Sequence, residues 1–278
     1  MRMSRNVVVF IVIAAAVSAV AIVFGAAAMD DVVQKSARTI GLPIDWQLNF
    51  HVPSTPFQYA VDWYHNLLLG IDLAICSLVA TLLLYSVWRF RRSRNPVPSA
   101  RTHNTPLEIV WTVIPTLIVV FLAFPSTRLV YAYNVMPKSQ MTVKVIGHQW
   151  YWEYRYPDQG HLDITSLIVP KANLKPGQPE LLTVDNEAVL PIGTVIRMQV
   201  TGADVIHSFM VPSLGLQKFA VPGRLNEIWT KIDRAGVYYG QCSQICGADH
   251  AFMPIVIRAV PPDQFEAWAK AQRAKAGS

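Results

Sequence analysis

Three apolar stretches dominate the first 134 positions of the chain: 7–28, 67–88 and 109–131. Each is close to the ~20 residues that a helix needs to cross a lipid bilayer. From Met141 onward the pattern changes to short runs rich in Val, Ile, Tyr and Trp, separated by Gly and Pro. Such runs are typical of strands joined by turns. The pattern therefore predicts a mixed membrane protein, with an N-terminal helical part followed by an all-β domain.

The first apolar stretch follows Arg2 and Arg5 and ends in the small residues of 25–29. A basic start, an apolar middle and a small-residue end are the parts of a secretory signal peptide. The apolar run is somewhat long for that role, so 1–28 is predicted to be either a cleaved signal peptide or a retained N-terminal anchor. Both alternatives send the next segment, 29–58, across the membrane.

The second and third stretches predict a hairpin of two transmembrane helices within 59–134. The connecting segment 89–101 carries five arginines, and no acidic residue occurs from Leu73 to Leu107. Basic loops tend to stay on the cytoplasmic side, so the segments that flank the hairpin are predicted to lie in the periplasm or an equivalent compartment. The net charge is +6, of which +4 precedes Val135. Most of this excess charge is therefore explained by membrane topology. Neither the part before Val135 nor the part after it resembles a nucleic-acid-binding protein.

The third stretch opens with Thr105, Pro106 and Glu108. This order predicts a capping box in which Thr105 is the N-cap, Pro106 takes the first helical position and Glu108 satisfies the backbone. A carboxylate at the cytoplasmic mouth of a membrane protein could also collect protons. The residues alone leave both roles open.

The β-rich part contains eight strand-like runs without helical periodicity between them, which favours a Greek-key β-sandwich over 135–260. The predicted strands are 141–146, 150–156, 181–184, 194–200, 205–211, 227–232, 236–239 and 254–260. The tail, 261–278, is predicted to start with a short helix, 261–270, that packs on the outside.

A group of soft metal ligands stands out in this domain. Cys242, Cys246, His250 and Met253 are spaced 4, 4 and 3 residues apart, and His207 lies 35 residues upstream at the end of a predicted strand. Two thiolates, two imidazoles and a thioether favour copper. A mononuclear blue copper site needs only one Cys, so the second thiolate suggests that two bridging sulfurs hold two coppers.

Two other readings of these residues remain open at this point. A Cys2His2 zinc site would use both cysteines and both histidines, but it leaves Met253 without a role. A disulfide between Cys242 and Cys246 would leave the histidines and the methionine idle. Three cysteines in 278 residues are in any case too few for a disulfide scaffold.

From about Leu67 to its end the chain resembles subunit II of haem-copper cytochrome c oxidase. The motifs that carry the resemblance keep their order and spacing along the chain. They are 94–98 (Arg-Asn-Pro-Val-Pro), 102–108, 147–152 (Gly-His-Gln-Trp-Tyr-Trp), 204–208, 221–224 and the copper loop 241–253.

The resemblance implies a cupredoxin-type domain that holds the binuclear copper centre called CuA. Cys242 and Cys246 would bridge the coppers, His207 and His250 would be terminal ligands, and Met253 and the backbone carbonyl of Gln244 would complete the set. It further implies a multi-pass protein of the bacterial inner membrane, partnered by subunits I and III. Haems would reside in subunit I, which reduces O2 to water and pumps protons with electrons that CuA accepts from cytochrome c.

Three further roles follow from the resemblance. Trp150 would be the place where electrons enter from cytochrome c. Core packing or an interfacial position is the alternative for Trp150, Tyr151 and Trp152, and the residues alone favour packing as the plainer explanation for Tyr151 and Trp152. Glu108 matches the acidic residue at the mouth of a proton-uptake path. The docking face for cytochrome c would include Asp163, Asp185 and Asp204.

Two positions depart from the family pattern. Arg155 stands where the family often has an acid, which predicts weaker or shifted docking. Gln244 stands where the family has Glu, whose carboxylate binds Mg2+ at the boundary with subunit I. A neutral amide is a poorer ligand for a hard dication, so Mg2+ binding is predicted to be weak or absent.

Two alternatives from other classes compete with this function. One is a membrane-tethered copper electron carrier or copper-delivery protein without an oxidase partner, against which Glu108 and the hairpin flanks argue. The other is a quinol-oxidase type of subunit II that has lost its copper site. The presence of all five soft ligands argues against the second.

Overall fold

A computed structural model describes residues 41–44, 47 and 49–276 of the chain. The predicted signal peptide or anchor, 1–28, lies outside the described residues, as does the first part of the segment 29–58. By their contacts the described residues form two units. One consists of 63–128, and the other combines 41–62 with 129–276.

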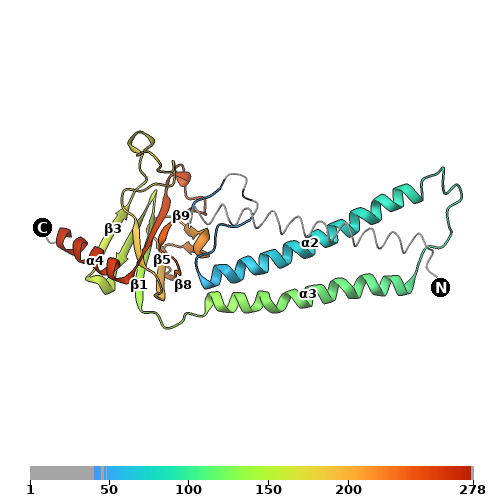
Figure 1. The fold of residues 1–278 in the computed structure, drawn as a ribbon, viewed down its shortest axis with the longest axis horizontal. Helices are drawn as coiled ribbons and strands as arrows, with labels where there is room; N and C mark the ends of the chain where they lie inside the picture. The colour runs from blue at the N-terminus through green and yellow to red at the C-terminus, as the bar shows by residue number, and fades with distance from the viewer. Residues whose placement is uncertain (1–40, 45–46, 48, 277–278) are drawn as a thin grey trace. The chain divides into compact units, whose positions relative to one another are not determined.

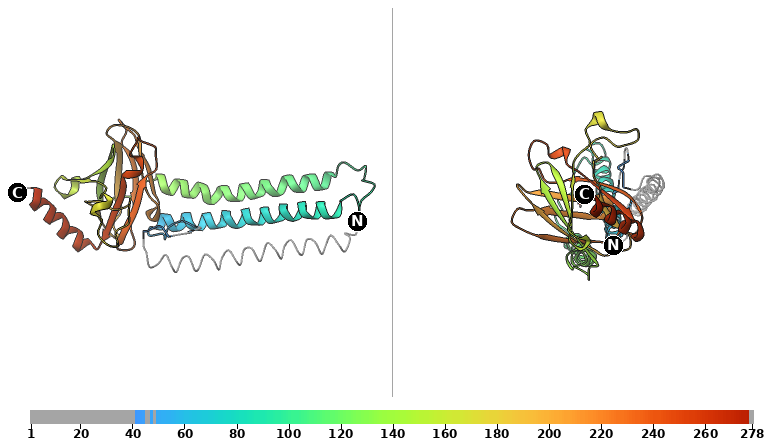
Figure 2. Two further views of the ribbon diagram at one scale, coloured as in Figure 1. Left: turned by 90° about the horizontal axis from the view of Figure 1, so that it is seen from above. Right: turned by 90° about the vertical axis from the view of Figure 1, so that its left-hand side faces the viewer.

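Two long helices form the apolar part of the chain, as the hydrophobic stretches predict. They are α2 (Pro56–Arg89) and α3 (Thr105–Asn134), and both are long and apolar enough to cross a membrane. Figures 1 and 2 show the two helices running side by side and joined by the arginine-rich loop. Within the helical unit, the Tyr64 hydroxyl donates a hydrogen bond to the Leu122 carbonyl at 3.2 Å, which links one helix to the other.

Helix α2 begins at Pro56, earlier than the predicted hairpin boundary at 59. The Thr55 hydroxyl accepts a hydrogen bond from the Gln58 N–H at 3.1 Å, so Thr55 is the N-cap and Pro56 takes the first helical position. The helix therefore starts at a polar cap that precedes the apolar run by about three turns.

The N-cap of helix α3 lies one residue before the predicted one. Asn104, and not Thr105, is the N-cap: its side-chain oxygen accepts from the Leu107 N–H at 3.4 Å. The Glu108 carboxylate accepts from the Asn104 N–H at 3.1 Å. Asparagine is at least as good an N-cap as threonine, which accounts for the shift. The backbone-satisfying role predicted for Glu108 is confirmed.

Ten strands in the described part of the chain form two five-stranded sheets that face each other as a sandwich. One sheet has the order β3-β2-β1-β5-β8 and the other β4-β10-β9-β6-β7. The pairs β1 with β5 and β4 with β10 are parallel, and the remaining pairs are antiparallel. The strands are β1 (Met141–His148), β2 (Tyr151–Tyr156), β3 (Leu162–Ser166), β4 (Ala188–Pro191), β5 (Ile196–Gly202), β6 (His207–Val211), β7 (Leu216–Ala220), β8 (Asn226–Thr230), β9 (Gly236–Cys242) and β10 (Pro254–Val260).

The sandwich is confirmed, but its strand list differs from the predicted one. The segment 181–184 is not a strand: Leu181 has a left-handed φ of 64°, and only a single bridge joins Val184 to Ile168. Strands β3, β4 and β7 were missed. Each lies at the edge of its sheet. Edge strands are short and need no regular alternation, so their sequence signal is weak.

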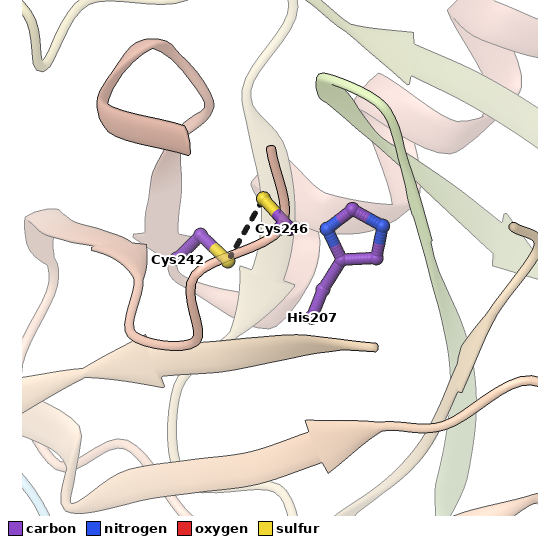
Figure 3. Close-up of side chains that lie close together, drawn as sticks. All are labelled: His207, Cys242 and Cys246. Atoms are coloured by element: carbon purple, nitrogen blue, oxygen red, sulfur yellow. Dashed lines mark hydrogen bonds between the residues drawn. The ribbon is translucent and has the colours of Figure 1, made fainter. Parts of the chain in front are cut away.

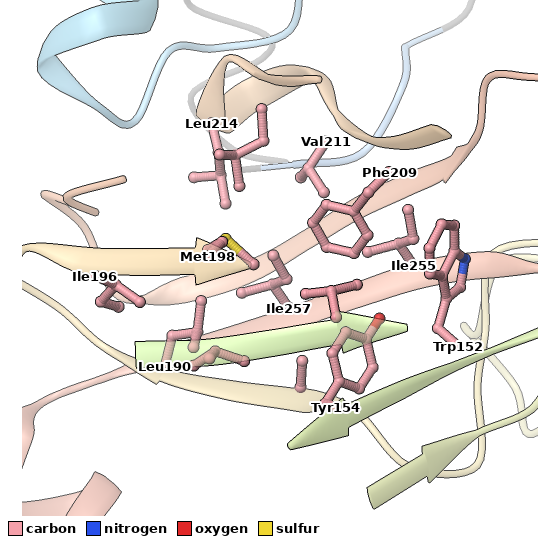
Figure 4. Close-up of a cluster of buried hydrophobic side chains, with 14 of the residues drawn as sticks. Trp152, Tyr154, Leu190, Ile196, Met198, Phe209, Val211, Leu214, Ile255 and Ile257 are labelled. Carbon is pink, nitrogen blue, oxygen red and sulfur yellow. The ribbon is translucent and has the colours of Figure 1, made fainter. Parts of the chain in front are cut away.

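The core lies between the two sheets. Fully buried side chains from both sheets interdigitate there, including Trp152, Tyr154, Phe209, Ile255 and Ile257 (Figure 4). The Phe209 ring packs edge-on against Trp152, with ring centroids 5.2 Å apart. This aromatic cluster supports the end of the sandwich from which the candidate metal ligands extend.

The tail forms helix α4 (Pro262–Ala276), which is longer than the predicted 261–270. It contacts β3 and β4, the edge strands on one side of the two sheets (Figure 1). Phe265 is buried beneath the helix, and Trp268 packs against Tyr156 with ring centroids 5.3 Å apart. The helix therefore covers an otherwise open side of the sandwich. Four short 3-10 helices complete the described elements: Pro157–Gln159, Lys171–Asn173, Pro212–Leu214 and His250–Phe252.

Candidate metal centre

Strand pairing brings the predicted ligands together at one end of the second sheet. Phe209 of β6 is the register partner of Cys242, the last residue of β9. His207, two residues before Phe209, consequently lies beside the loop that connects β9 to β10. That loop carries Cys246, His250 and Met253, so residues far apart in sequence meet at one point.

The two cysteine sulfurs lie 3.9 Å apart, and one ligating atom from each of His207, Cys242 and Cys246 lies within 4.8 Å of the other two (Figure 3). The Cys246 sulfur is also 3.6 Å from Nδ1 of His250 and 3.5 Å from the Met253 sulfur. The Gln244 carbonyl oxygen lies 3.2 Å from the Cys242 sulfur. All six predicted ligands are therefore in one cluster, and both cysteines are free thiols.

His207 has one ring nitrogen that the protein itself does not satisfy. Its Nε2 lies 2.8 Å from the Asp204 carboxylate, which fixes the orientation of the ring. Its Nδ1 is buried and has no hydrogen-bond partner. An imidazole held by a carboxylate through one nitrogen while the other faces soft donors is the usual arrangement of a metal ligand. The donor set thus fits a soft metal such as copper.

The two neighbouring thiols shift each other's acidity. Burial raises the pKa of Cys242, but the nearby His207 imidazole and neighbouring backbone groups lower it to about 7. Burial and the neighbouring Cys242 charge raise the pKa of Cys246 to about 12. Two thiolates this close repel each other, so both are ionised near neutral pH only when a cation lies between them. A metal ion would supply that charge.

Neighbouring groups hold the ligand loop in place. The Ser243 N–H donates to the Ser208 carbonyl at 3.0 Å, and the hydroxyls of these two serines are 2.8 Å apart. The indole N–H of Trp152 donates to the Met253 carbonyl at 3.2 Å. The buried Trp152 is thus a packing residue, as its plainer explanation predicts.

The hairpin between β1 and β2 approaches the loop closely. Its two connecting residues are Gln149 and Trp150, and the Gln149 amide donates to the Cys246 carbonyl at 2.8 Å. A Cβ added to Gly247 would lie 2.9 Å from a ring carbon of Trp150. Trp150 is half-buried and its indole nitrogen has no hydrogen-bond partner.

The three predicted docking acids are all engaged in local contacts. Asp163 faces Arg155 at 3.8 Å, and Asp185 accepts from the Leu167 N–H at 2.7 Å. Asp204 accepts from His207 and from the Gln149 N–H. Partial burial raises the pKa of Asp204, but these hydrogen bonds bring it below its ordinary value. Their role in docking stays a prediction, and Glu108 lies in the other unit, in the first turn of α3.

Three residues that support the ligands are not predicted from the sequence in this role. Asp204 was singled out only as a surface charge, although its position three residues before His207 is a local signal for an orienting carboxylate. Gln149 belongs to the motif 147–152, but its support of Cys246 leaves no local signal, because the two residues are 97 positions apart. Gly147 belongs to the same motif, and an added Cβ there would lie 2.9 Å from two ring carbons of His207.

A groove of about 1000 Å³ lies next to the loop and is lined by Gln244. Its other walls include Ile206, Phe219 and Val221, with Arg224 beside them. Ile206 and Phe219 are 45% and 49% exposed. Large apolar side chains gathered at a surface groove are typical of an interaction surface.

The sequence matches two family descriptions. Residues 141–260 match the periplasmic domain of cytochrome c oxidase subunit II, and residues 43–129 match its transmembrane domain. A probable cytochrome c oxidase subunit 2 from Rickettsia felis is 47% identical over 226 residues, which are 81% of this chain and 72% of the relative. The mitochondrial cytochrome c oxidase subunit 2 of Glycine max is 45% identical over 234 residues, 82% of this chain and 59% of the relative.

One solved structure among the similar ones is the periplasmic domain of subunit II of cytochrome oxidase (CoxB) of Bradyrhizobium japonicum. It shares 50% sequence identity and covers 51% of this chain and 99% of its own, with a TM-score of 0.48.

Proposed function

Because the chain belongs to the cytochrome c oxidase subunit II family, we propose that its β-sandwich holds the binuclear copper centre CuA and receives electrons there from cytochrome c. The chain is a subunit of a haem-copper oxidase, with a membrane part and a periplasmic domain. We place it in the bacterial inner membrane. Subunits I and III are its proposed partners, and the haems belong to subunit I.

The observation that carries the proposal is the buried, unpartnered Nδ1 of His207 beside two thiols and a thioether. Cys242, Cys246, His207 and His250 would hold the copper pair with their side chains. Met253 and the Gln244 carbonyl would complete the set. When bound, the copper pair supplies a one-electron redox centre in which the charge is shared by two metals. The protein contributes a loop held by Ser208, Trp152 and Gln149, which keeps the ligands in place.

The test is the metal content and electron paramagnetic resonance spectrum of the purified oxidase complex. We expect two coppers per chain in this subunit, sharing one unpaired electron. Stoichiometric zinc, or one copper with a single-nucleus spectrum, would contradict the proposal. Met253 favours copper over zinc at this site, because a Cys2His2 zinc site does not use a thioether ligand.

Trp150 is the proposed point at which electrons enter. Its half-buried ring lies over Gly247 of the ligand loop, so one edge is close to the metal ligands while the other side remains accessible. Cytochrome c would dock around it, drawn by Asp163, Asp185 and Asp204. Arg155 lies beside Asp163 and offsets part of that charge, which favours docking displaced from Asp163.

The groove lined by Ile206, Phe219 and Gln244 is the proposed contact with subunit I. Ile245, at the tip of the ligand loop, is 81% exposed, which is unusual for an isoleucine unless a partner covers it. A contact here would bring subunit I directly to the residues that hold the copper.

Glu108 is proposed to collect protons for uptake into subunit I in addition to capping α3. Glu108→Gln keeps an oxygen that can accept from the Asn104 N–H but removes the charge, whereas Glu108→Ala removes both. We expect both variants to slow proton uptake and turnover several-fold with unchanged copper spectra, as measured by proton release and O2 consumption in vesicles. If Glu108 is only a cap, Glu108→Gln will turn over like the parent and Glu108→Ala alone will be less stable, by about 1 kcal/mol.

Gln244 is proposed to leave the Mg2+ position of the family weak or empty. Its amide is uncharged, while Mg2+ prefers carboxylate oxygens. We expect Gln244→Glu to gain one tightly held Mn2+ per complex, measured by metal analysis and electron paramagnetic resonance after Mn2+ loading. Gln241→Glu, an exposed neighbour on β9, is the matched control and should gain none. A stoichiometric ion bound at Gln244 in the parent complex would show this prediction to be wrong.

A further inference from the structure

The Gln149 side chain is the one direct polar link described between the β1–β2 hairpin and the second bridging cysteine. Its Nε2 donates to the Cys246 carbonyl at 2.8 Å. The amide orientation is not ambiguous, because a carbonyl can only accept and the NH2 group must face it. The bond joins segments that are 97 residues apart in the chain.

The same residue is tied to the other side of the cluster through its backbone. The Gln149 N–H donates to Asp204 Oδ2 at 2.6 Å, and Oδ1 of that carboxylate lies 2.8 Å from His207 Nε2. Gln149 therefore connects a terminal ligand on one strand to a bridging ligand on the loop. Asp204 is itself held by the Val205 N–H at 2.6 Å.

Gly247 makes this contact sterically feasible. Its φ is +127°, and an added Cβ would lie 2.9 Å from both Gln149 Nε2 and a ring carbon of Trp150. The hairpin thus rests on the bare backbone of the ligand loop. Close approach of two backbones is a common reason for a glycine at such a position.

We propose that Gln149 is a positioning residue that fixes the Trp150 ring and the Cys246 backbone at one separation, with Gly247 supplying the space. The inference rests on the proposed function, in which Trp150 is where electrons enter. When bound, copper would supply the one-electron chemistry, with the iron of a c-type haem protein as the reductant. No bond forms or breaks, and Gln149 itself carries no electron.

The hairpin that carries Trp150 lies at the surface, which is the physical reason why a positioning residue is needed there. The Trp150 indole nitrogen has no hydrogen-bond partner, so without Gln149 only packing would hold the ring. The Gln149 bond is anchored on the carbonyl of Cys246, itself a proposed metal ligand, so it couples the position of the ring to the ligand loop. Misplacement by about 1 Å of a group that must be aligned for reaction can cost up to about 100-fold in rate.

The test compares Gln149→Leu and Gly247→Ala with the parent in the purified oxidase complex. Gln149→Leu keeps most of the side-chain volume but removes the donor, and Gly247→Ala pushes the hairpin away while the donor remains. Gln264→Leu, the same substitution on the exposed face of α4, is the matched control. Trp150→Phe serves as the comparator for direct loss of the indole.

We expect both variants to retain two coppers per chain and the KM for the donor protein. The rate of reduction by saturating cytochrome c should fall about 10-fold in both. The hyperfine coupling of the Cys246 β-protons should change in the electron paramagnetic resonance spectrum. Hydrogen exchange of 243–250 in the copper-free chain should become faster. Gln264→Leu should match the parent in all four measurements.

Several results would overturn the inference. One is a rate and spectrum of Gln149→Leu equal to those of the parent. A raised KM at an unchanged saturating rate would make Gln149 a docking residue. Loss of copper would make it part of the metal site. If the parent complex itself lacks a binuclear copper spectrum, the proposed function fails first, and the exchange rates of 243–250 still decide whether Gln149 holds the loop.

Discussion

Cys246→Ser is expected to abolish the proposed binuclear copper centre and to lower cytochrome c oxidation by the complex by at least about 100-fold. Loss of a residue that only hydrogen-bonds a metal ligand costs up to about 100-fold, so loss of the ligand itself should cost at least as much. The Cys246 sulfur is the middle of the cluster, 3.9 Å from the Cys242 sulfur, 3.6 Å from His250 Nδ1 and 3.5 Å from the Met253 sulfur. A serine hydroxyl is a harder ligand that stays protonated near neutral pH, so it cannot replace a thiolate that bridges soft metal ions.

The measurement is copper content, electron paramagnetic resonance and O2 uptake of the purified complex. Cys76→Ser is the matched control, because Cys76 is exposed on α2 and contacts none of the ligands. It should leave all three readouts at the level of the parent. A Cys246→Ser complex that keeps two coppers sharing one electron would show that this thiolate does not bridge them.

Phe209→Ala is expected to destabilise the β-sandwich by about 3–5 kcal/mol, the usual cost of removing a large buried aromatic ring. The Phe209 side chain is 0% exposed and lies between the two sheets (Figure 4). Its ring contacts Trp152 at a centroid distance of 5.2 Å and Tyr154 at 6.4 Å. Because its backbone pairs with Cys242, the cavity would also loosen the end of the sheet that holds the ligands.

The free energy of unfolding can be followed by proteolysis of the β-domain in the full chain at increasing urea concentration. Phe219→Ala is the matched control, since Phe219 lies on the neighbouring strand β7 but is 49% exposed. The control should change the free energy of unfolding by less than about 0.5 kcal/mol. Equal losses for the two variants would mean that Phe209 does not belong to the stabilising core.

The sequence by itself determined the division into an apolar helical part and a β-rich domain. This was possible because a membrane-spanning helix and an alternating strand leave local periodic signals. It also identified all six ligand candidates. Four of them carry side chains on a single loop with spacings of 4, 4 and 3, and His207 lies 35 residues upstream at the end of a predicted strand. The Gln244 carbonyl was implied by the family resemblance. Those signals depend on residues close together in the chain, or on side-chain chemistry alone.

The tertiary structure decided which groups support the ligands and where the strands with a weak sequence signal lie. Asn104 displaced Thr105 as the cap of α3, and the edge strands β3, β4 and β7 formed without a clear alternation of their own. The links from Gln149 to Asp204 and to Cys246 join residues 55 and 97 positions apart. A hydrogen bond between distant residues leaves no periodic or local signal in the sequence, because it depends on the register that two packed sheets impose.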